Sequence, residues 1–217
     1  MSKLRKTMEV VLRGRKKYYV ISNFLMFVLG GTQILHAQEQ TKLLKREEWG
    51  AHPATKAMQQ NTPTKLTIHH TGTAPNYKKS IDVKLKALQS FSQTDSRLAD
   101  GRLKSAWADV PYHYYIDVEG KAAEGRQAQF LGDSNTTYDL RGHLSVVLEG
   151  NFDSAPPTDA QVRALTSLLK SLAVAHHIRP ENIGAHKQFA KTACPGRYLM
   201  TMLPKIRADV AALMRDD

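Results

Sequence analysis

The 217-residue sequence predicts an α/β fold, a single domain with a central mixed β-sheet flanked by helices. Short β-rich runs alternate along the chain with amphipathic stretches of helical period, which is typical of helices packed on the faces of a sheet. Apolar residues make up 41% of the chain and charged residues 24%, as in an ordinary globular domain. A chain of this length can bury one good core.

The expected strands are short runs rich in β-branched and aromatic residues. LSVVL at 144–148 is apolar apart from Ser145, which favours a central strand, and KLTIHH at 65–70 ends in two histidines. A turn at Glu119-Gly120 joins two of the runs as a hairpin. The expected strands are 65–70, 110–118, 121–126, 144–148 and 183–186.

Three helices are expected between and after these strands. The clearest follows Thr158-Asp159-Ala160-Gln161, which is a capping box. Ser80 is the expected N-cap of an earlier helix that runs to about Arg97. A last helix begins near Arg197, and we expect Pro204 to interrupt or restart it.

Three further segments complete the predicted layout. Trp49 follows a polar lead-in and is expected to pack on the domain edge. Residues 94–106 are expected to form a polar loop. Residues 131–143 are polar and contain glycine, so we expect a loop that lies over the functional site.

The formal charge of +11 is concentrated near the start of the chain. Residues 1–37 hold seven Lys or Arg and one Glu, a net +6, which leaves 11 − 6 = +5 for the rest. That excess is mild, so nucleic-acid binding is not inferred. A moderately basic body suits an acidic polymer such as bacterial cell wall, although a charge that serves only solubility explains it equally well.

Residues 1–37 have the three-part layout of a secretory signal, with a basic start, an apolar run and a small residue at Ala37. The alternative is an N-terminal membrane anchor, in which case the chain contacts a membrane only through this uncleaved segment. In both cases residues 38–217 are expected to be exported, to the bacterial periplasm or cell envelope or to the medium.

Cys194 is the only cysteine, so an intrachain disulfide is excluded. His186 precedes it by eight positions, and the His69-His70 pair lies far upstream. Zinc accepts imidazole nitrogen and thiolate sulfur, and a catalytic zinc site uses three protein ligands. The spacing matches no zinc-finger pattern, and from position alone burial of Cys194 as a small hydrophobe is favoured.

Several ordered segments resemble the N-acetylmuramoyl-L-alanine amidase type 2 and peptidoglycan-recognition-protein family, in its phage-type zinc amidase branch. The resemblance runs from about residue 45 to 200. The segments are Arg46-Glu47-Glu48-Trp49-Gly50-Ala51, Ile68-His69-His70-Thr71, the stretch 107–116, Glu124-Gly125-Arg126, Glu149-Gly150-Asn151-Phe152 and His186 with Thr192-Ala193-Cys194-Pro195-Gly196.

The resemblance implies that His69, His186 and Cys194 hold one Zn²⁺. His70 is the alternative to His69, but adjacent strand residues face opposite sides, so only one of the two can be a ligand. The resemblance also implies that the Tyr112 hydroxyl points at the zinc water, and that Thr192 stands where active relatives carry Lys or Thr.

Glu149 is a further catalytic candidate, as the general base that a glutamate provides in the family's cytoplasmic muropeptide-recycling branch. The competing interpretation is a hydrogen-bonded carboxylate at a strand end. His113 is expected to be packed or to support a ligand, and His143 is ambiguous between loop surface and substrate cleft.

The implied activity of the domain at 38–217 is that of a zinc-dependent N-acetylmuramoyl-L-alanine amidase acting on peptidoglycan or muropeptides. It would hydrolyse the amide between N-acetylmuramic acid and L-alanine of the stem peptide. The first alternative is a module that binds peptidoglycan without cutting it; non-catalytic members of the family commonly lack the ligating cysteine, which this chain keeps. A zinc peptidase that cuts within the stem peptide is a further alternative.

The chain departs from the family pattern beside the implied site. Many relatives carry Gly-Ala-His before the central strand, and this chain has Gly132-Asp133-Ser134. Relatives often carry Asn-Ser just before that strand, where Gly142-His143 stands here. These changes lie where the glycan and the stem peptide are expected to bind, so they leave the fine substrate preference open and do not affect the implied zinc ligands.

Overall fold

The computed structural model of the chain describes residues 42–98 and 100–215. The signal or anchor predicted for residues 1–37 lies outside the described residues. Within them, no helix combines the length and the apolar character that crossing a membrane requires.

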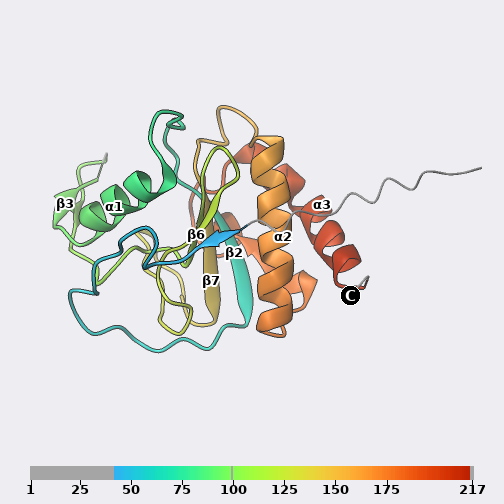
Figure 1. Cartoon of the computed structure of the whole chain (residues 1–217), viewed down its shortest axis with the longest axis horizontal. Helices are drawn as coiled ribbons and strands as arrows, with labels where there is room; N and C mark the ends of the chain where they lie inside the picture. The colour runs from blue at the N-terminus through green and yellow to red at the C-terminus, as the bar shows by residue number, and fades with distance from the viewer. Residues whose placement is uncertain (1–41, 99, 216–217) are drawn as a thin grey trace, which may run out of the picture. The chain divides into compact units, whose positions relative to one another are not determined.

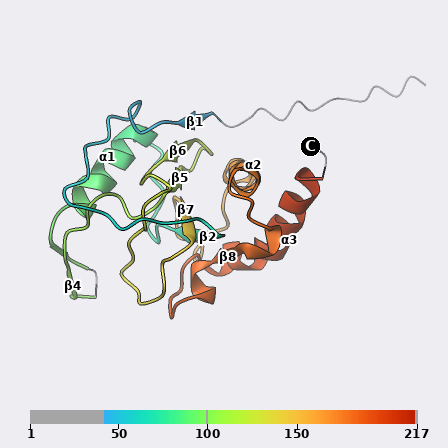
Figure 2. The same cartoon turned by 90° about the horizontal axis from the view of Figure 1, so that it is seen from below.

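Six strands form one sheet in the order β1-β6-β5-β7-β2-β8 (Figures 1 and 2). All neighbours in the sheet are parallel except β5 and β6, which form an antiparallel hairpin, so the predicted mixed sheet is confirmed. The strands are β1 (Leu43–Leu44), β2 (Lys65–His70), β5 (Tyr114–Ile116), β6 (Ala122–Glu124), β7 (His143–Leu148) and β8 (Ile183–Ala185).

Helices cover both faces of this sheet. Figures 1 and 2 show α1 (Ile81–Ser92) on one face and α2 (Asp159–Ala175) with α3 (Arg197–Leu213) on the other. The predicted capping box opens α2: the Gln161 N–H donates to the Thr158 hydroxyl at 3.1 Å, and the Thr158 N–H donates to the Gln161 side chain at 3.1 Å. Two 3₁₀ turns, η1 (Pro180–Asn182) and η2 (His186–Gln188), flank β8.

The first helix is shorter than predicted, and the loop expected at 94–106 contains a small hairpin. The strands of the hairpin are β3 (Ser96–Arg97) and β4 (Leu103–Lys104). The helix stops at Ser92 because the carbonyl of that residue accepts from the Trp107 N–H at 2.8 Å and from the Lys104 ammonium at 3.0 Å.

Two other sequence predictions are also corrected. The strand expected over 110–118 is limited to Tyr114–Ile116. Before it, Pro111 has no amide hydrogen to add to a strand pairing, and after it the turn to β6 begins, where the Asp117 carbonyl accepts from the Gly120 N–H at 3.0 Å. Pro204 does not interrupt α3. Pro204 is exposed, and buried Leu203 and Ile206 on either side of it hold the helix on the core.

Trp49 lies deeper than the domain edge. Its side chain is fully buried, and the indole N–H donates to the Glu124 carbonyl at 2.7 Å. It packs with Leu85 of α1 and with Tyr115 and Val147 of the sheet. This cluster forms the core on the α1 face, whereas the larger core lies between the sheet and α2 and α3.

The strand register decides which face carries which side chains. One row across the sheet runs from His69 through Val147, Tyr115 and Ala123 to Leu44, and its apolar members pack in the α1-side core. The adjacent row begins at His70, and its members Leu148 and Ile116 belong to the larger core. His69 and His70 therefore lie on opposite faces of the sheet.

Replacing Leu85 by alanine tests how strongly the α1-side core supports the fold. Leu85 is fully buried, so the substitution should lower the free energy of unfolding by about 2–5 kcal/mol. Urea denaturation followed by circular dichroism measures this change. Val83→Ala on the same helix is the matched control, because Val83 is 42% exposed and should change stability by less than about 0.5 kcal/mol. Equal losses in the two variants would contradict the assignment of Leu85 to a core.

Candidate metal centre

The pairing of β2 with β8 brings two histidines together. Ala185 pairs with Ile68, and both side chains lie in the larger core. The next residue of each segment, His186 and His69, therefore lies on the opposite side of the sheet, and the two ring centroids are 4.5 Å apart. Both side chains are buried.

Cys194 joins the two histidines from the loop before α3. Two hydrogen bonds fix the start of that helix to the segment after β7. The Tyr198 N–H donates to the Phe152 carbonyl at 3.0 Å, and the Arg197 N–H donates to the Asp153 carboxylate at 2.8 Å. Gly196 has φ 89°, and a Cβ there would collide with the Phe152 backbone. The loop can approach the strand ends this closely only with glycine at this position.

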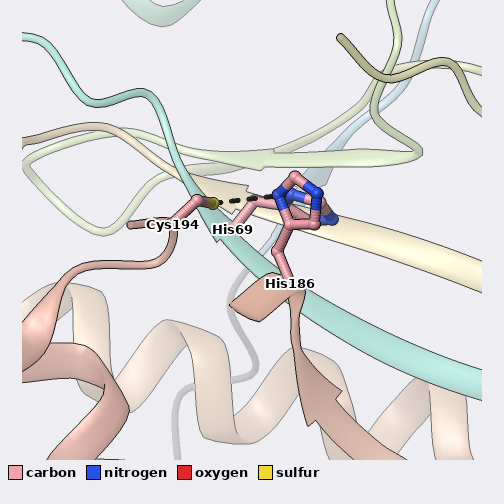
Figure 3. Close-up of side chains that lie close together, drawn as sticks. All are labelled: His69, His186 and Cys194. Carbon is pink, nitrogen blue, oxygen red and sulfur yellow. Dashed lines mark hydrogen bonds between the residues drawn. The ribbon is translucent and has the colours of Figure 1, made fainter. Parts of the chain in front are cut away.

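The donor atoms of His69, His186 and Cys194 lie within 4.8 Å of one another. Figure 3 shows the sulfur directed at the imidazoles, with Sγ 3.6 Å from the His69 Nδ1. The His70 N–H also donates to this sulfur at 3.4 Å. The buried Nε2 of His69 has no hydrogen-bond partner within the described part of the chain. A buried ring nitrogen without a partner is costly, and a metal or a water would satisfy it.

The protonation states of these groups suit a metal site. Burial lowers the pKa of His69 well below its ordinary value and that of His186 to about 4, so both rings are neutral at neutral pH. Burial raises the pKa of the Cys194 thiol to about 12. A cation in the cluster would favour the thiolate, because a coordinating thiol gives up its proton. Two neutral imidazoles and one thiolate form a ligand set typical of zinc with one open position.

Tyr112 lies beside the cluster, just before β5. Its ring centroid is 5.3 Å from that of His69. Burial, followed by the charge of Cys194, raises the pKa of Tyr112 above its ordinary value, so the hydroxyl keeps its proton at neutral pH. Tyr112 therefore carries a protonated hydroxyl on a ring that lies beside His69.

Thr192 lies two residues before Cys194, and its side chain is half-buried. Its hydroxyl oxygen accepts from the Cys194 N–H at 3.2 Å. The hydroxyl hydrogen is not used in that bond, so Thr192 both shapes the cysteine loop and retains a donor.

Glu149 follows β7 and is occupied by other partners. Its buried carboxylate accepts from the Lys84 ammonium at 2.8 Å and from the backbone N–H groups of Asn76 and Val118 at 2.7 and 3.1 Å. These contacts favour the interpretation as a hydrogen-bonded strand-end carboxylate over that of a general base. Through them Glu149 holds α1 and the loop before it against the sheet.

The other histidines considered from the sequence have separate partners. His70 accepts from the Phe152 N–H at 3.2 Å on the far face of the sheet. His113 is buried between the Ser145 hydroxyl and the Phe130 carbonyl, at 2.9 and 2.8 Å. His143 is buried rather than on a loop surface, and its Nδ1 lies 2.6 Å from the Thr67 hydroxyl.

Two residues of the loop at 131–143 reach the site, and sequence reasoning did not single them out. The Thr136 hydroxyl lies 2.6 Å from the His186 Nε2, and the Tyr138 ring centroid is 5.1 Å from the His186 ring. These contacts place the loop beside His186, in agreement with the prediction that it lies over the site. The sequence signal was only the position of the loop before the central strand.

Comparisons with known proteins agree with the fold. Peptidoglycan-recognition protein SD of Drosophila melanogaster is 26% identical over 186 residues, which are 82% of this chain and 92% of that protein. A human N-acetylmuramoyl-L-alanine amidase is 33% identical over 99 residues, 45% of this chain and 17% of the human protein.

Solved structures share the same architecture. Drosophila peptidoglycan recognition protein SD superposes with a TM-score of 0.65 at 24% identity, covering 76% of this chain and 94% of that one. The N-acetylmuramoyl-L-alanine amidase LysC from Clostridium intestinale URNW gives 0.61 at 20% identity, covering 78% and 97%. These likenesses support the fold alone.

The family model described as N-acetylmuramoyl-L-alanine amidase (Amidase_2) matches residues 59–197. The matched region is more than half of the chain and includes β2, the central strand β7 and the cysteine loop. This chain belongs to the N-acetylmuramoyl-L-alanine amidase family.

Proposed function

We propose that this protein is a zinc-dependent amidase that hydrolyses the bond between N-acetylmuramic acid and L-alanine in peptidoglycan. The observation that carries the proposal is the convergence of His69, His186 and Cys194 with their donor atoms within 4.8 Å. A family fold alone would support binding and catalysis equally. A buried set of three metal donors favours catalysis, because it leaves one coordination position for the reaction.

Metal binding and stabilisation of the developing charge would then fall to different residues. His69, His186 and Cys194 hold Zn²⁺, which when bound polarises the scissile carbonyl and activates water. The protonated hydroxyl of Tyr112 donates a hydrogen bond to the oxygen on which negative charge develops. A donor fixed in a buried site needs no reorganisation when that charge appears.

Thr192 supplies a second donor in this proposal. Its hydroxyl hydrogen remains available while its oxygen accepts from the Cys194 N–H. A neutral hydroxyl stabilises an oxyanion less than a lysine ammonium would at the same place. Glu149 is left out of the mechanism because its carboxylate is bound to Lys84, Asn76 and Val118.

A recognition module that binds peptidoglycan without cutting it is the second candidate. It is favoured by relatives named peptidoglycan-recognition proteins, which match most of this chain. One solved neighbour is described as an ectodomain complex of two peptidoglycan recognition proteins with bound tracheal cytotoxin. The three converging donors favour the enzyme over this module. Export to the cell envelope stays a prediction, because it depends on residues 1–37.

Digestion of purified sacculi, with mass spectrometry of the soluble products, tests the reaction. The proposal predicts free stem peptides that begin with L-alanine. Peptides cut within the stem would instead indicate a peptidase with the same metal site. Binding to sacculi without any product, from zinc-loaded protein, would contradict the amidase and support the recognition module.

Metal content tests the three-ligand site directly. Purified protein should bind about one zinc per chain, as measured by elemental analysis and by competition with a chromophoric chelator. Cys194→Ser replaces a thiolate by a neutral hydroxyl, so zinc affinity should fall by more than the roughly 10–100-fold that loss of an outer hydrogen-bond partner costs. His52→Ala removes an exposed imidazole outside the cluster and serves as the control. Unchanged affinity in the Cys194 variant would refute the site.

Tyr112→Phe tests the proposed oxyanion donor. The variant keeps the ring beside His69 but loses the hydroxyl, so zinc affinity should stay at the wild-type level. The turnover number should fall by roughly 10²–10³, the usual cost of one such donor. Steady-state kinetics on a defined muropeptide measure the loss. Wild-type turnover in this variant would remove Tyr112 from the mechanism.

A further inference from the structure

The loop at 131–143 contacts the His186 ring through two residues. The Thr136 hydroxyl lies 2.6 Å from the His186 Nε2. The ring of Tyr138 lies beside the same imidazole at a centroid distance of 5.1 Å, and Tyr138 also stacks on Phe189 at 6.4 Å. Thr136 thus contacts a ring nitrogen of His186, and Tyr138 packs beside the ring.

The hydrogen bonds around Thr136 can all be made in one consistent direction, in which His186 donates to Thr136 and Thr136 donates to Ser134. Ser134 accepts the Thr136 N–H at 3.1 Å, and the two hydroxyl oxygens lie 2.8 Å apart. When the Thr136 hydroxyl donates to Ser134, its lone pairs face the His186 Nε2. A neutral imidazole carries one ring hydrogen, and this acceptor favours its location on Nε2. The other nitrogen, Nδ1, is then left with a free lone pair.

We propose that Thr136 is a positioning residue that holds the His186 ring with its hydrogen on Nε2 and its Nδ1 open to the metal. The inference rests on the proposed zinc function. A metal-binding histidine normally donates its second ring N–H to a protein group that fixes the ring and its tautomer. In this chain a hydroxyl takes that place, and Ser134 in turn orients the hydroxyl.

Ser134 and Thr136 belong to the loop at 131–143, which precedes the central strand β7. The contact of Thr136 with His186 links this loop to the proposed metal ligands.

Thr136→Val tests the proposal, because valine keeps the shape of threonine and removes the hydroxyl. Zinc affinity should fall roughly 10–100-fold, measured by chelator competition. Thr136→Ser should restore affinity close to that of the wild type, since the hydroxyl returns. Thr137→Val is the matched control, because Thr137 is the exposed neighbour in the same loop and should leave affinity unchanged.

A readout without metal separates this inference from the proposed function. In metal-free protein with ¹⁵N-labelled histidine, long-range ¹H–¹⁵N spectra should show the Nε2–H form of His186 in the wild type and in Thr136→Ser. A mixture of tautomers is expected in Thr136→Val. Circular dichroism of each variant confirms that it is folded.

The outcomes are distinct. Affinity and tautomer in Thr136→Val equal to those of Thr137→Val would overturn the positioning role while leaving the zinc proposal intact. Failure of the wild type to bind zinc would overturn the proposed function, and the assignment of Nδ1 as a ligand with it. Weakened binding, mixed tautomers and rescue by serine together support the inference.

Discussion

The parallel pairing of β8 with β2 is the constraint on which the site depends. Ala185 opposite Ile68 places both side chains in the larger core. The residues that follow must then emerge on the other side of the sheet, and both are histidines. A shift of this register by one residue would send one imidazole into the larger core. Apolar packing on the other face of the sheet therefore fixes the positions of the two histidines.

The same alternation explains which parts of the fold could be predicted from the sequence. KLTIHH and LSVVL are runs whose period and composition identify a strand without any tertiary information, and both strands begin and end within one residue of the prediction. The capping box of α2 is equally local. The end of α1 is not local, because Trp107 and Lys104 capture the Ser92 carbonyl from beyond the helix. The continuity of α3 through Pro204 is not local either, since core contacts on both sides of the proline hold the helix together.

The candidate site divides in a similar way. His69, His186, Cys194 and Tyr112 were assigned by resemblance to ordered motifs, and the structure brings these four together. Thr136 and Tyr138 belong to a polar loop without regular structure, and composition does not reveal which residue of such a loop turns inward. Glu149 is a different case, because the sequence left two interpretations open, a general base and a hydrogen-bonded strand-end carboxylate. Lys84 and two backbone N–H groups occupy its carboxylate, which favours the second interpretation.

The donors come from two distant parts of the chain, since 125 positions separate Cys194 from His69. A metal bound by all three residues would cross-link the two ends of the segment between His69 and Cys194, as a disulfide would. Closing a long loop removes many conformations from the unfolded chain, and ligand binding to the folded state alone raises stability further. The lone cysteine can thus give the domain the cross-link that it cannot form with a second cysteine. Resistance to heat and to proteases would then follow the supply of zinc in its surroundings.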